Sequence, residues 1–440
     1  MTIFAFLDRF SKTLPHKICL INGSTAVTYR ELSNEVELLA SKLASRFNKG
    51  EKILVKHAEP IKQLCLLLAA SKAGVITILI DPLADEFLIQ ETMKKAGASC
   101  CIDAETKLHA GEVGFLPNIS ESDIFLGALS SGSSGKPKLI WRDHQSWRRA
   151  FPVQSRVFNL SSEDILLIAG SLIYTANLNS CLHLLHEGGT VVISKKAVPR
   201  TWIKEIKAQE ITAVFMVPTN YRILLNAVKE PMKKVMSLIS AGAKMNLNTV
   251  EELLKVFPQA RFYEYYGTGE LGHISYASSV DLQKNPDSVG KQFPGVKIWT
   301  ENEEIWVESP YLAPDYSPKA GSGDLGFIND EGFLFLLGRK DNVINKGGVK
   351  VLAEQVEKVL SLYPGVVEAA VGGLADLIRG EKVVAWIERD TTEITAKELR
   401  SHCRKNLPKH YRPQEYNFID KIPKNANGKV DRKRLKAGLV

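Results

Sequence analysis

A Ser-, Gly- and Lys-rich stretch behind an apolar run is the strongest constraint on the fold of this 440-residue chain. The apolar run, Ile124 to Leu129, predicts a strand, and the stretch from Ser130 to Lys138 follows it directly. Glycine and serine let a loop fold closely around an anion and present N–H groups to it, and Lys136 and Lys138 add positive charge. The stretch is not a Walker A loop, because Pro137 follows Lys136. It is either a phosphate-binding loop, with a triphosphate as the obvious ligand, or a Ser/Gly linker.

Length and composition indicate a globular protein with at least two domains and a sizeable core. Hydrophobic residues make up 45% of the chain and charged residues 24%, which is ordinary for soluble proteins. The net charge is +8, yet no long Lys/Arg run or nucleic-acid-binding signature accompanies it. We therefore expect polyanionic small molecules as partners and no nucleic acid.

The cysteines and the N-terminus predict a cytoplasmic protein. The six cysteines form no CxxC pair, which argues against a zinc site or a disulfide framework and favours a reducing compartment. Asp8 and Arg9 interrupt the first apolar turn, so the layout of a signal peptide is missing. The most apolar segment, Leu64 to Ile80, contains Lys72 and Gly74 and predicts a buried helix followed by a strand instead of a membrane span.

Short apolar runs alternate with helical patterns along most of the chain. Lys52 to Val55 and Val75 to Ile80 are continuous apolar runs separated by one helix, which predicts a β-α-β unit with buried parallel strands. In the last hundred residues, helical patterns over Ala353–Leu362 and Ala396–Asn406 surround two apolar strands. This region predicts a small α+β domain of its own.

Five further motifs follow the Ser130–Lys138 stretch in chain order: Ser240-Ala241-Gly242-Ala243, Tyr265-Tyr266-Gly267-Thr268-Gly269-Glu270, Gly323-Asp324, Gly338-Arg339-Lys340-Asp341 and Pro423 to Lys429. The ordered series resembles the ANL superfamily of adenylate-forming enzymes, which comprises acyl- and aryl-CoA synthetases, adenylation domains and firefly luciferase. The likeness runs from about Thr28 to Arg432.

The resemblance implies an α/β fold, with a large N-terminal domain of mixed parallel sheets and helices and a small C-terminal α+β domain. The large AMP-binding domain would comprise residues 1–340 and the small mobile domain residues 341–440, with a hinge near Asp341. It also implies that Gly347 and Gly348 line a channel for CoA.

The resemblance further implies a site for ATP and Mg²⁺. Glu270 would hold the metal, Tyr266 would stack on adenine and Asp324 would accept hydrogen bonds from the ribose hydroxyls. Lys138, Glu270 and Lys429 are the expected catalytic residues, and Lys429 would bridge carboxylate and phosphate. The expected nucleotide-binding residues are Ser130, Ser131, Gly132, Ser133, Ser134, Gly135, Lys136, Gly242, Ala243, Tyr265, Tyr266, Gly267, Thr268, Asp324 and Arg339.

The acid substrate is expected to be fatty or aromatic, with Tyr174 and Leu271 in the acyl pocket. Relatives that activate amino acids commonly hold the ammonium with an Asp in the region of Ser171 to Ser180, which has no carboxylate here. A buried ammonium without a counter-charge would be costly, which disfavours amino acids. The sequence also departs from the family pattern, because Gly269 replaces a Thr and Asn345 replaces a common Lys.

We therefore expect an ATP-dependent acid–CoA ligase, a ligase that forms carbon–sulfur bonds. A carboxylate and ATP would give an acyl-adenylate and pyrophosphate, and CoA would then take the acyl group. One alternative is a stand-alone enzyme that loads a separate acyl carrier protein. The other is a catalytically idle binding protein of the ANL fold, motivated by the departures at Gly269 and Asn345 and by the absence of the family's His near Tyr174.

Overall fold

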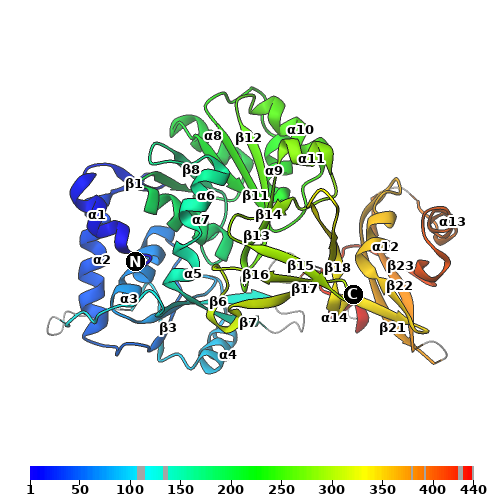
Figure 1. Cartoon of the computed structure of the whole chain (residues 1–440), viewed down its shortest axis with the longest axis horizontal. Coiled ribbons are helices and arrows are strands. Elements are labelled where there is room, and N and C mark those ends of the chain that lie inside the picture. The colour runs from blue at the N-terminus through cyan, green and yellow to red at the C-terminus, as the bar shows by residue number, and fades with distance from the viewer. Residues whose placement is uncertain (107–113, 132–136, 378–379, 391–392, 425–429, 439–440) are drawn as a thin grey trace.

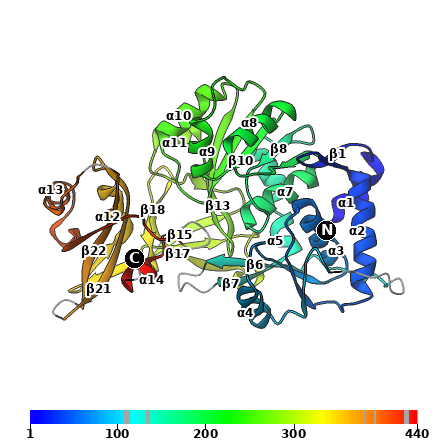
Figure 2. The same cartoon turned by 180° about the vertical axis from the view of Figure 1, so that it is seen from behind.

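The chain folds into a mixed α/β structure with a large N-terminal part and a small C-terminal domain, as the sequence predicts (Figures 1 and 2). The computed structural model describes residues 1–106, 114–131, 137–377, 380–390, 393–424 and 430–438. Its strands form four sheets, three in the large part and one in the small domain.

The largest sheet has nine strands in the order β14-β13-β12-β11-β10-β8-β9-β1-β2. Its central strands are parallel and almost wholly buried, which is why they read as continuous apolar runs, and antiparallel strands close both edges. The strands are β1 (Ile18–Asn22), β2 (Thr25–Thr28), β8 (Ile165–Ile168), β9 (Thr190–Ile193), β10 (Ala213–Met216), β11 (Ser237–Ala241), β12 (Arg261–Thr268), β13 (Gly272–Ser278) and β14 (Lys291–Gln292). Its helices are α6 (Phe151–Phe158), α7 (Thr175–Glu187), α8 (Pro199–Ala208), α9 (Pro218–Leu225), α10 (Leu247–Val256) and α11 (Ser279–Lys284).

The second sheet, in the order β5-β3-β4-β6-β7, contains the predicted β-α-β unit. Its parallel strands are β3 (Lys52–Val55), β4 (Ile76–Leu79), β5 (Cys100–Ile102) and β6 (Ile124–Ser131), and β7 (Pro137–Asp143) pairs with β6 in antiparallel register. The helices are α1 (Ala5–Thr13), α2 (Tyr29–Ala44), α3 (Pro60–Lys72), α4 (Glu86–Ala96) and α5 (His144–Arg148). One apolar core joins this sheet to the nine-stranded sheet.

The prediction of a buried helix followed by a strand between Leu64 and Ile80 is confirmed by α3 and β4. Along α3, residues 63–71 are all buried, so the helix is covered by protein on all sides. In the described part of the chain, no helix combines the length and apolarity that crossing a bilayer requires.

The third sheet is antiparallel and lies between the large sheets and the small domain (Figure 1). It consists of β15 (Lys297–Glu301), β16 (Glu304–Glu308), β17 (Lys319–Ile328) and β18 (Leu334–Arg339), and the short helix η1 (Pro314–Tyr316) precedes β17.

The small domain follows a short 3₁₀ helix, η2 (Lys340–Asn342), and has apolar cores of its own. Its sheet has the order β20-β19-β22-β21, with β23 beside β22. The elements are β19 (Val343–Lys346), β20 (Val349–Leu352), α12 (Ala353–Leu360), β21 (Val366–Asp376), β22 (Gly380–Arg389), α13 (Ala396–Asn406), η3 (Lys409–Tyr411), β23 (Glu415–Ile419) and α14 (Arg432–Lys436). A boundary at Asp341 remains a proposal.

Candidate functional site

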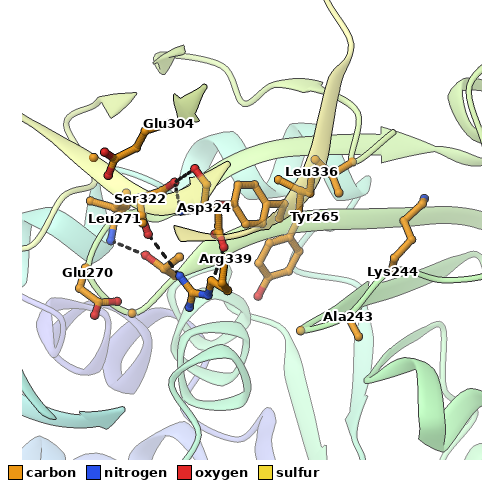
Figure 3. A pocket seen from close by; sticks show the side chains of 18 of the residues that line it. Ala243, Lys244, Tyr265, Glu270, Leu271, Glu304, Ser322, Asp324, Leu336 and Arg339 are labelled. Atoms are coloured by element: carbon orange, nitrogen blue, oxygen red, sulfur yellow. Dashed lines mark hydrogen bonds and ion pairs between the residues drawn. The ribbon is translucent and has the colours of Figure 1, made fainter. Parts of the chain in front are cut away.

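A cavity of about 600 Å³ lies where the three sheets of the large part meet the joint to the small domain (Figure 3). Its walls come from β7, the loop after β11, β12 with the turn that follows it, β17 and β18. The lining residues that the sequence had singled out are Lys138, Gly242, Ala243, Tyr265, Tyr266, Gly267, Thr268, Gly269, Glu270, Leu271, Asp324, Arg339 and Asp341. Motifs up to 200 residues apart in the chain therefore share one cavity.

Asp324 is the centre of a hydrogen-bonded group on one wall of this cavity. Its Oδ2 accepts a hydrogen bond from the Tyr266 hydroxyl, and its Oδ1 lies 3.1 Å from Nε of Arg339. Arg339 also donates from Nη1 to the backbone carbonyl of Ser322 at 3.3 Å, as Figure 3 shows. Asp324 lies within β17, directly opposite Arg339 on β18, and not in the hairpin turn that a Gly-Asp pair alone would indicate.

The pairing keeps Tyr266 in its neutral, hydrogen-donating form. Burial, and then the neighbouring Asp324 carboxylate, raise the pKa of Tyr266 well above its usual value. The phenol therefore remains protonated at neutral pH and orients Asp324.

Lys138, Glu270 and Tyr316 form a second group that lines the cavity. The Lys138 ammonium lies 4.0 Å from Oε1 of Glu270, donates to the Tyr316 hydroxyl and sits 5.0 Å from the centre of the Tyr316 ring. The hydrogen bond to Tyr316, and more weakly the charge of Glu270, raise the pKa of Lys138, so this side chain stays charged. The result is a cation beside a carboxylate, the pair that a metal-bound polyphosphate requires.

The turn that carries Glu270 is fixed mainly through its backbone. Leu271 N–H donates to Oγ1 of Thr268 at 3.1 Å, and the Glu270 carbonyl accepts from Ala313 N–H at 2.8 Å. The Gly269 and Glu270 carbonyls also accept from Nη1 of Arg142 at 3.2 and 3.3 Å. The Thr268 hydroxyl thus stabilises the turn at the position next to the missing Thr.

Several residues of the site had no signal in the sequence analysis. Lys244 lies 2.8 Å from Oε1 of the buried Glu264, whose Oε2 accepts from Met245 N–H at 2.6 Å. Burial raises the pKa of Glu264, and the Lys244 charge offsets part of that rise. The parallel pairing of β11 with β12 places Ala241 beside Tyr265. Knowledge of this register would have allowed the contact between Lys244 and Glu264 to be predicted. Glu304, which pairs with Lys340 at 2.7 Å, also lines the cavity.

Other predicted residues lie away from the cavity wall or outside the described residues. Tyr174 caps the start of α7 and is 41% exposed, and Gly347 and Gly348 form the turn between β19 and β20. Ser130 and Ser131 end β6, opposite Lys138 and Pro137. Gly132, Ser133, Ser134, Gly135, Lys136 and Lys429 lie outside the described residues.

Two family models match the chain. The model described as "AMP-binding enzyme" matches residues 7–114 and 112–316, and "AMP-binding enzyme C-terminal domain" matches residues 355–429. Among curated relatives, the uncharacterized acyl–CoA ligase YhfT of Bacillus subtilis is 28% identical, and the match covers 100% of this chain and 98% of that protein. The 2-succinylbenzoate–CoA ligase of Bacillus pumilus is 27% identical, over 96% of this chain and 95% of that protein.

The solved structures that match include several states of one enzyme, the o-succinylbenzoate CoA synthetase MenE of Bacillus subtilis. Its complex with the acyl-adenylate OSB-AMP has a TM-score of 0.90 at 22% identity, covering 98% of this chain and 97% of that one. The complex with ATP and magnesium has a TM-score of 0.88 at 22% identity, covering 98% and 99%. A double mutant bound to the product analogue OSB-NCoA, also 22% identical and covering 98% of each chain, has a TM-score of 0.72. At this identity the likeness shows the fold.

Proposed function

This chain belongs to the AMP-binding enzyme family of the ANL superfamily, and from that premise we propose that it is an ATP-dependent acid–CoA ligase. The observation that carries the proposal is the single cavity into which Lys138, Glu270, Tyr266, Asp324 and Arg339 converge. The acyl–CoA ligases among the relatives support the same reaction class.

The proposed reaction has two steps. In the first, a carboxylate oxygen of the acid forms a bond to the α-phosphorus of ATP, the bond from that phosphorus to the bridging oxygen breaks, and pyrophosphate leaves. In the second, the sulfur of CoA forms a bond to the acyl carbon, the carbon–oxygen bond to AMP breaks, and the thiol proton passes to solvent. The products are acyl-CoA, AMP and pyrophosphate.

The nucleoside is proposed to lie along the wall formed by Tyr266 and Asp324. A tyrosine ring stacks on adenine, and the Asp324 carboxylate accepts from the ribose hydroxyls. Gly242 and Ala243 have no side chain beyond a methyl group, so the backbone after β11 lies close to the base. Arg339 contributes a positive charge to the same wall.

The phosphates are proposed to lie between Lys138 and Glu270. The Glu270 side chain is 24% exposed and supplies a hard oxygen ligand at the cavity surface, so it fits Mg²⁺. When bound, Mg²⁺ neutralises phosphate oxygens during displacement. Lys138 stabilises negative charge on the same oxygens, and Lys429, assigned on its sequence motif alone, is proposed to bridge carboxylate and phosphate.

We propose a fatty or aromatic acid as the substrate. Leu271 is a buried apolar residue that lines the cavity beside Glu270, and no carboxylate occurs between Ser171 and Ser180 to hold an ammonium group. Tyr174 is proposed to border the acyl site from the start of α7. CoA is the proposed acceptor, with Gly347 and Gly348 along its path, and a carrier protein is the competing acceptor.

Two orientations of the small domain are part of this proposal, with Asp341 as the pivot. The chain matches the adenylate-bound MenE structure with a TM-score of 0.90 and the structure bound to the product analogue with 0.72. This difference supports an adenylating arrangement for the structure described here. Thioester formation would then require rotation of the small domain.

Pyrophosphate release from Mg·ATP with a panel of fatty, aromatic and amino acids tests the function. We expect release with a fatty or aromatic acid, hydroxylamine trapping of the adenylate without CoA, and CoA consumption when CoA is added. Adenylate that is trapped but never passed to CoA would point to a carrier protein. No pyrophosphate with any acid would overturn the proposal in favour of a binding protein.

A further inference from the structure

One face of β7 is directed at the turn that carries Glu270. Side chains alternate along a strand, so Lys138, Ile140 and Arg142 point to the same side. Lys138 approaches the Glu270 carboxylate, Ile140 packs under Gly269, and Arg142 reaches the carbonyls of Gly269 and Glu270. Every second residue of β7 from Lys138 to Arg142 therefore contacts the turn at Gly269 and Glu270.

Arg142 is buried, and its hydrogen bonds go to backbone carbonyls. The residue is 1% exposed, and its guanidinium donates to four backbone carbonyls: Gly269, Glu270, Ser146 at 3.3 Å and Tyr311 at 2.8 Å. Among the described residues its Nε has no partner. Burial lowers the pKa of Arg142 to about 10, so it remains charged at neutral pH. Burying a guanidinium without a bound carboxylate is costly, and an apolar side chain of similar volume would avoid this cost.

The two segments that Arg142 holds are the two that contact Lys138. Glu270 belongs to the first segment. Tyr311 begins the second, which continues through η1 to Tyr316, the acceptor of the Lys138 hydrogen bond. A single guanidinium therefore fixes both neighbours of the Lys138 ammonium.

The turn lies close to β7 at Gly269. A Cβ atom at this position would lie 2.8 Å from Cδ1 of Ile140, closer than two carbon atoms normally approach. Gly269 and the Arg142 hydrogen bonds thus mark the same close contact between β7 and the turn.

We propose that Arg142 is a positioning residue that sets Glu270 and Tyr316 around Lys138 for binding of Mg·ATP. This inference rests on the proposed function, and it concerns a residue that touches neither substrate nor metal. Arg142 acts through the backbone of the Glu270 turn and of the Tyr311 segment.

The test compares Arg142→Met, Arg142→Lys and Trp141→Phe with the parent protein. Trp141 is the matched control, because it precedes Arg142 on β7, faces the opposite side and packs against Gly127. Binding of Mg·ATP is measured by calorimetry, and kcat and KM are measured for ATP and for the acid. We expect Arg142→Met to weaken Mg·ATP binding and to lower kcat on the order of 10²-fold, the scale for misplacing a catalytic group by about 1 Å. KM for the acid should not change, Arg142→Lys should recover part of both losses, and Trp141→Phe should retain parental kinetics.

The Arg142→Lys variant decides the matter if Arg142→Met does not fold. Lysine keeps the charge but supplies one nitrogen in place of a rigid fork, so it cannot hold the Glu270 turn and the Tyr311 carbonyl together, and its affinity for Mg·ATP should fall. Parental binding and kcat in a folded Arg142→Met, or in a folded Arg142→Lys, would overturn the inference. If the parent binds no Mg·ATP and releases no pyrophosphate, the proposed function fails and the inference falls with it. If the parent binds Mg·ATP and releases pyrophosphate, the variants test the role of Arg142 alone.

Discussion

Asp324 already has both carboxylate oxygens engaged by protein groups, the Tyr266 hydroxyl on one and Arg339 on the other. Each contact fixes the direction of the carboxylate, and the oxygens retain lone pairs for two hydroxyl donors. Such preorganisation lowers the entropic cost of binding a nucleoside.

Replacing Asp324 by Asn should therefore weaken ATP binding sharply. The amide puts an N–H₂ group at one of two positions where an acceptor is required, and hydrogen bonds to a charged group contribute about 1.5–3 kcal/mol. We expect the Kd for ATP to rise about 10- to 100-fold. Calorimetric titration with ATP measures this, and Asp330→Asn in the exposed β17–β18 turn is the control. Equal affinities in Asp324→Asn and the parent would remove Asp324 from the ribose site.

Among the described residues, four histidines are held in neutral form, three of them buried and His186 half-buried, and they make stability depend on pH. Burial lowers the pKa of His144 and His186 from 6.5 to about 4, and that of His183 and His273 to about 3. Below pH 6.5 the unfolded chain thus binds more protons than the folded chain, so stability is complete above 6.5 and is lost as the pH falls toward 4. Burial raises the pKa of the Glu264 and Glu357 carboxyls, which act in the opposite sense.

The urea concentration at the midpoint of unfolding should therefore decrease when the pH is lowered from 7.5 to 5. Each unmatched proton lowers the free energy of unfolding by about 1.4 kcal/mol per pH unit. Replacing His273, which packs between Tyr265 and Phe293, by Gln should reduce this slope by about one proton. A midpoint that does not change between the two pH values would contradict the burial of these rings as neutral groups.

Residues with a dedicated motif were predictable, and residues defined by packing were not. Lys138, Tyr266, Glu270, Asp324 and Arg339 stand in short patterns, and all five line the cavity. Arg142 carries no such pattern, because its role depends on which carbonyls lie beneath β7. In a sequence it is one basic residue among many.

At the level of elements, the apolar runs and helical patterns closely predicted the elements that they marked. The helix α13 spans the predicted Ala396–Asn406, and β3 spans the predicted Lys52 to Val55. No strand was predicted around Asp324, because a Gly-Asp pair is ordinary turn chemistry, while β17 runs straight through it. The segment is extended because it pairs with β18, and the sequence of one strand does not show which strand will pair with it.

The last helix, α14, is attached to the small domain through Arg432. Arg432 Nη2 donates to Oε1 of Glu357, the same oxygen accepts from Val371 N–H at 2.7 Å, and Arg432 Nε donates to the Val371 carbonyl at 3.1 Å. One arginine thus joins α14, α12 and β21.

Arg432→Gln should leave the Glu357 carboxylate without its charged partner. We expect a loss of about 3 kcal/mol, the scale for breaking a largely buried pair, confined to the small domain. Hydrogen exchange should show faster opening in α12 and β21 and unchanged protection in β10 and β11. Lys433→Gln, at an exposed position on the same helix, is the control. Equal protection in Arg432→Gln and the parent would contradict this role.

At the scale of the whole molecule, the small domain is joined to the rest through η2. Beside that joint, Lys358 of α12 pairs with Asp287 at 2.8 Å, with both side chains more than 60% exposed. Exposed ion pairs contribute about 0–1 kcal/mol, so this one does not lock the domains together.

Asp341→Pro is the corresponding test of the proposed pivot. Proline fixes φ near −65° and removes an N–H donor, so it should hold the joint in one arrangement. In the adenylating arrangement proposed above, we expect pyrophosphate release to persist while CoA consumption collapses. Asp341→Ala leaves the backbone free to rotate and should retain both activities. Acyl-CoA formation by Asp341→Pro at the parental rate would place the pivot elsewhere.

The ion pairs at the joint also affect how readily a protease cleaves the chain there. Arg339 and Lys340, adjacent in the chain, are both trypsin sites, and their partners Asp324 and Glu304 line the cavity. A nucleotide that engages Asp324 and Arg339 would hold this segment against the cavity wall and shield it from cleavage. Brief digestion with and without Mg·ATP should then yield either an intact chain or a large and a small fragment, so the band pattern on a gel would report whether the cavity is filled.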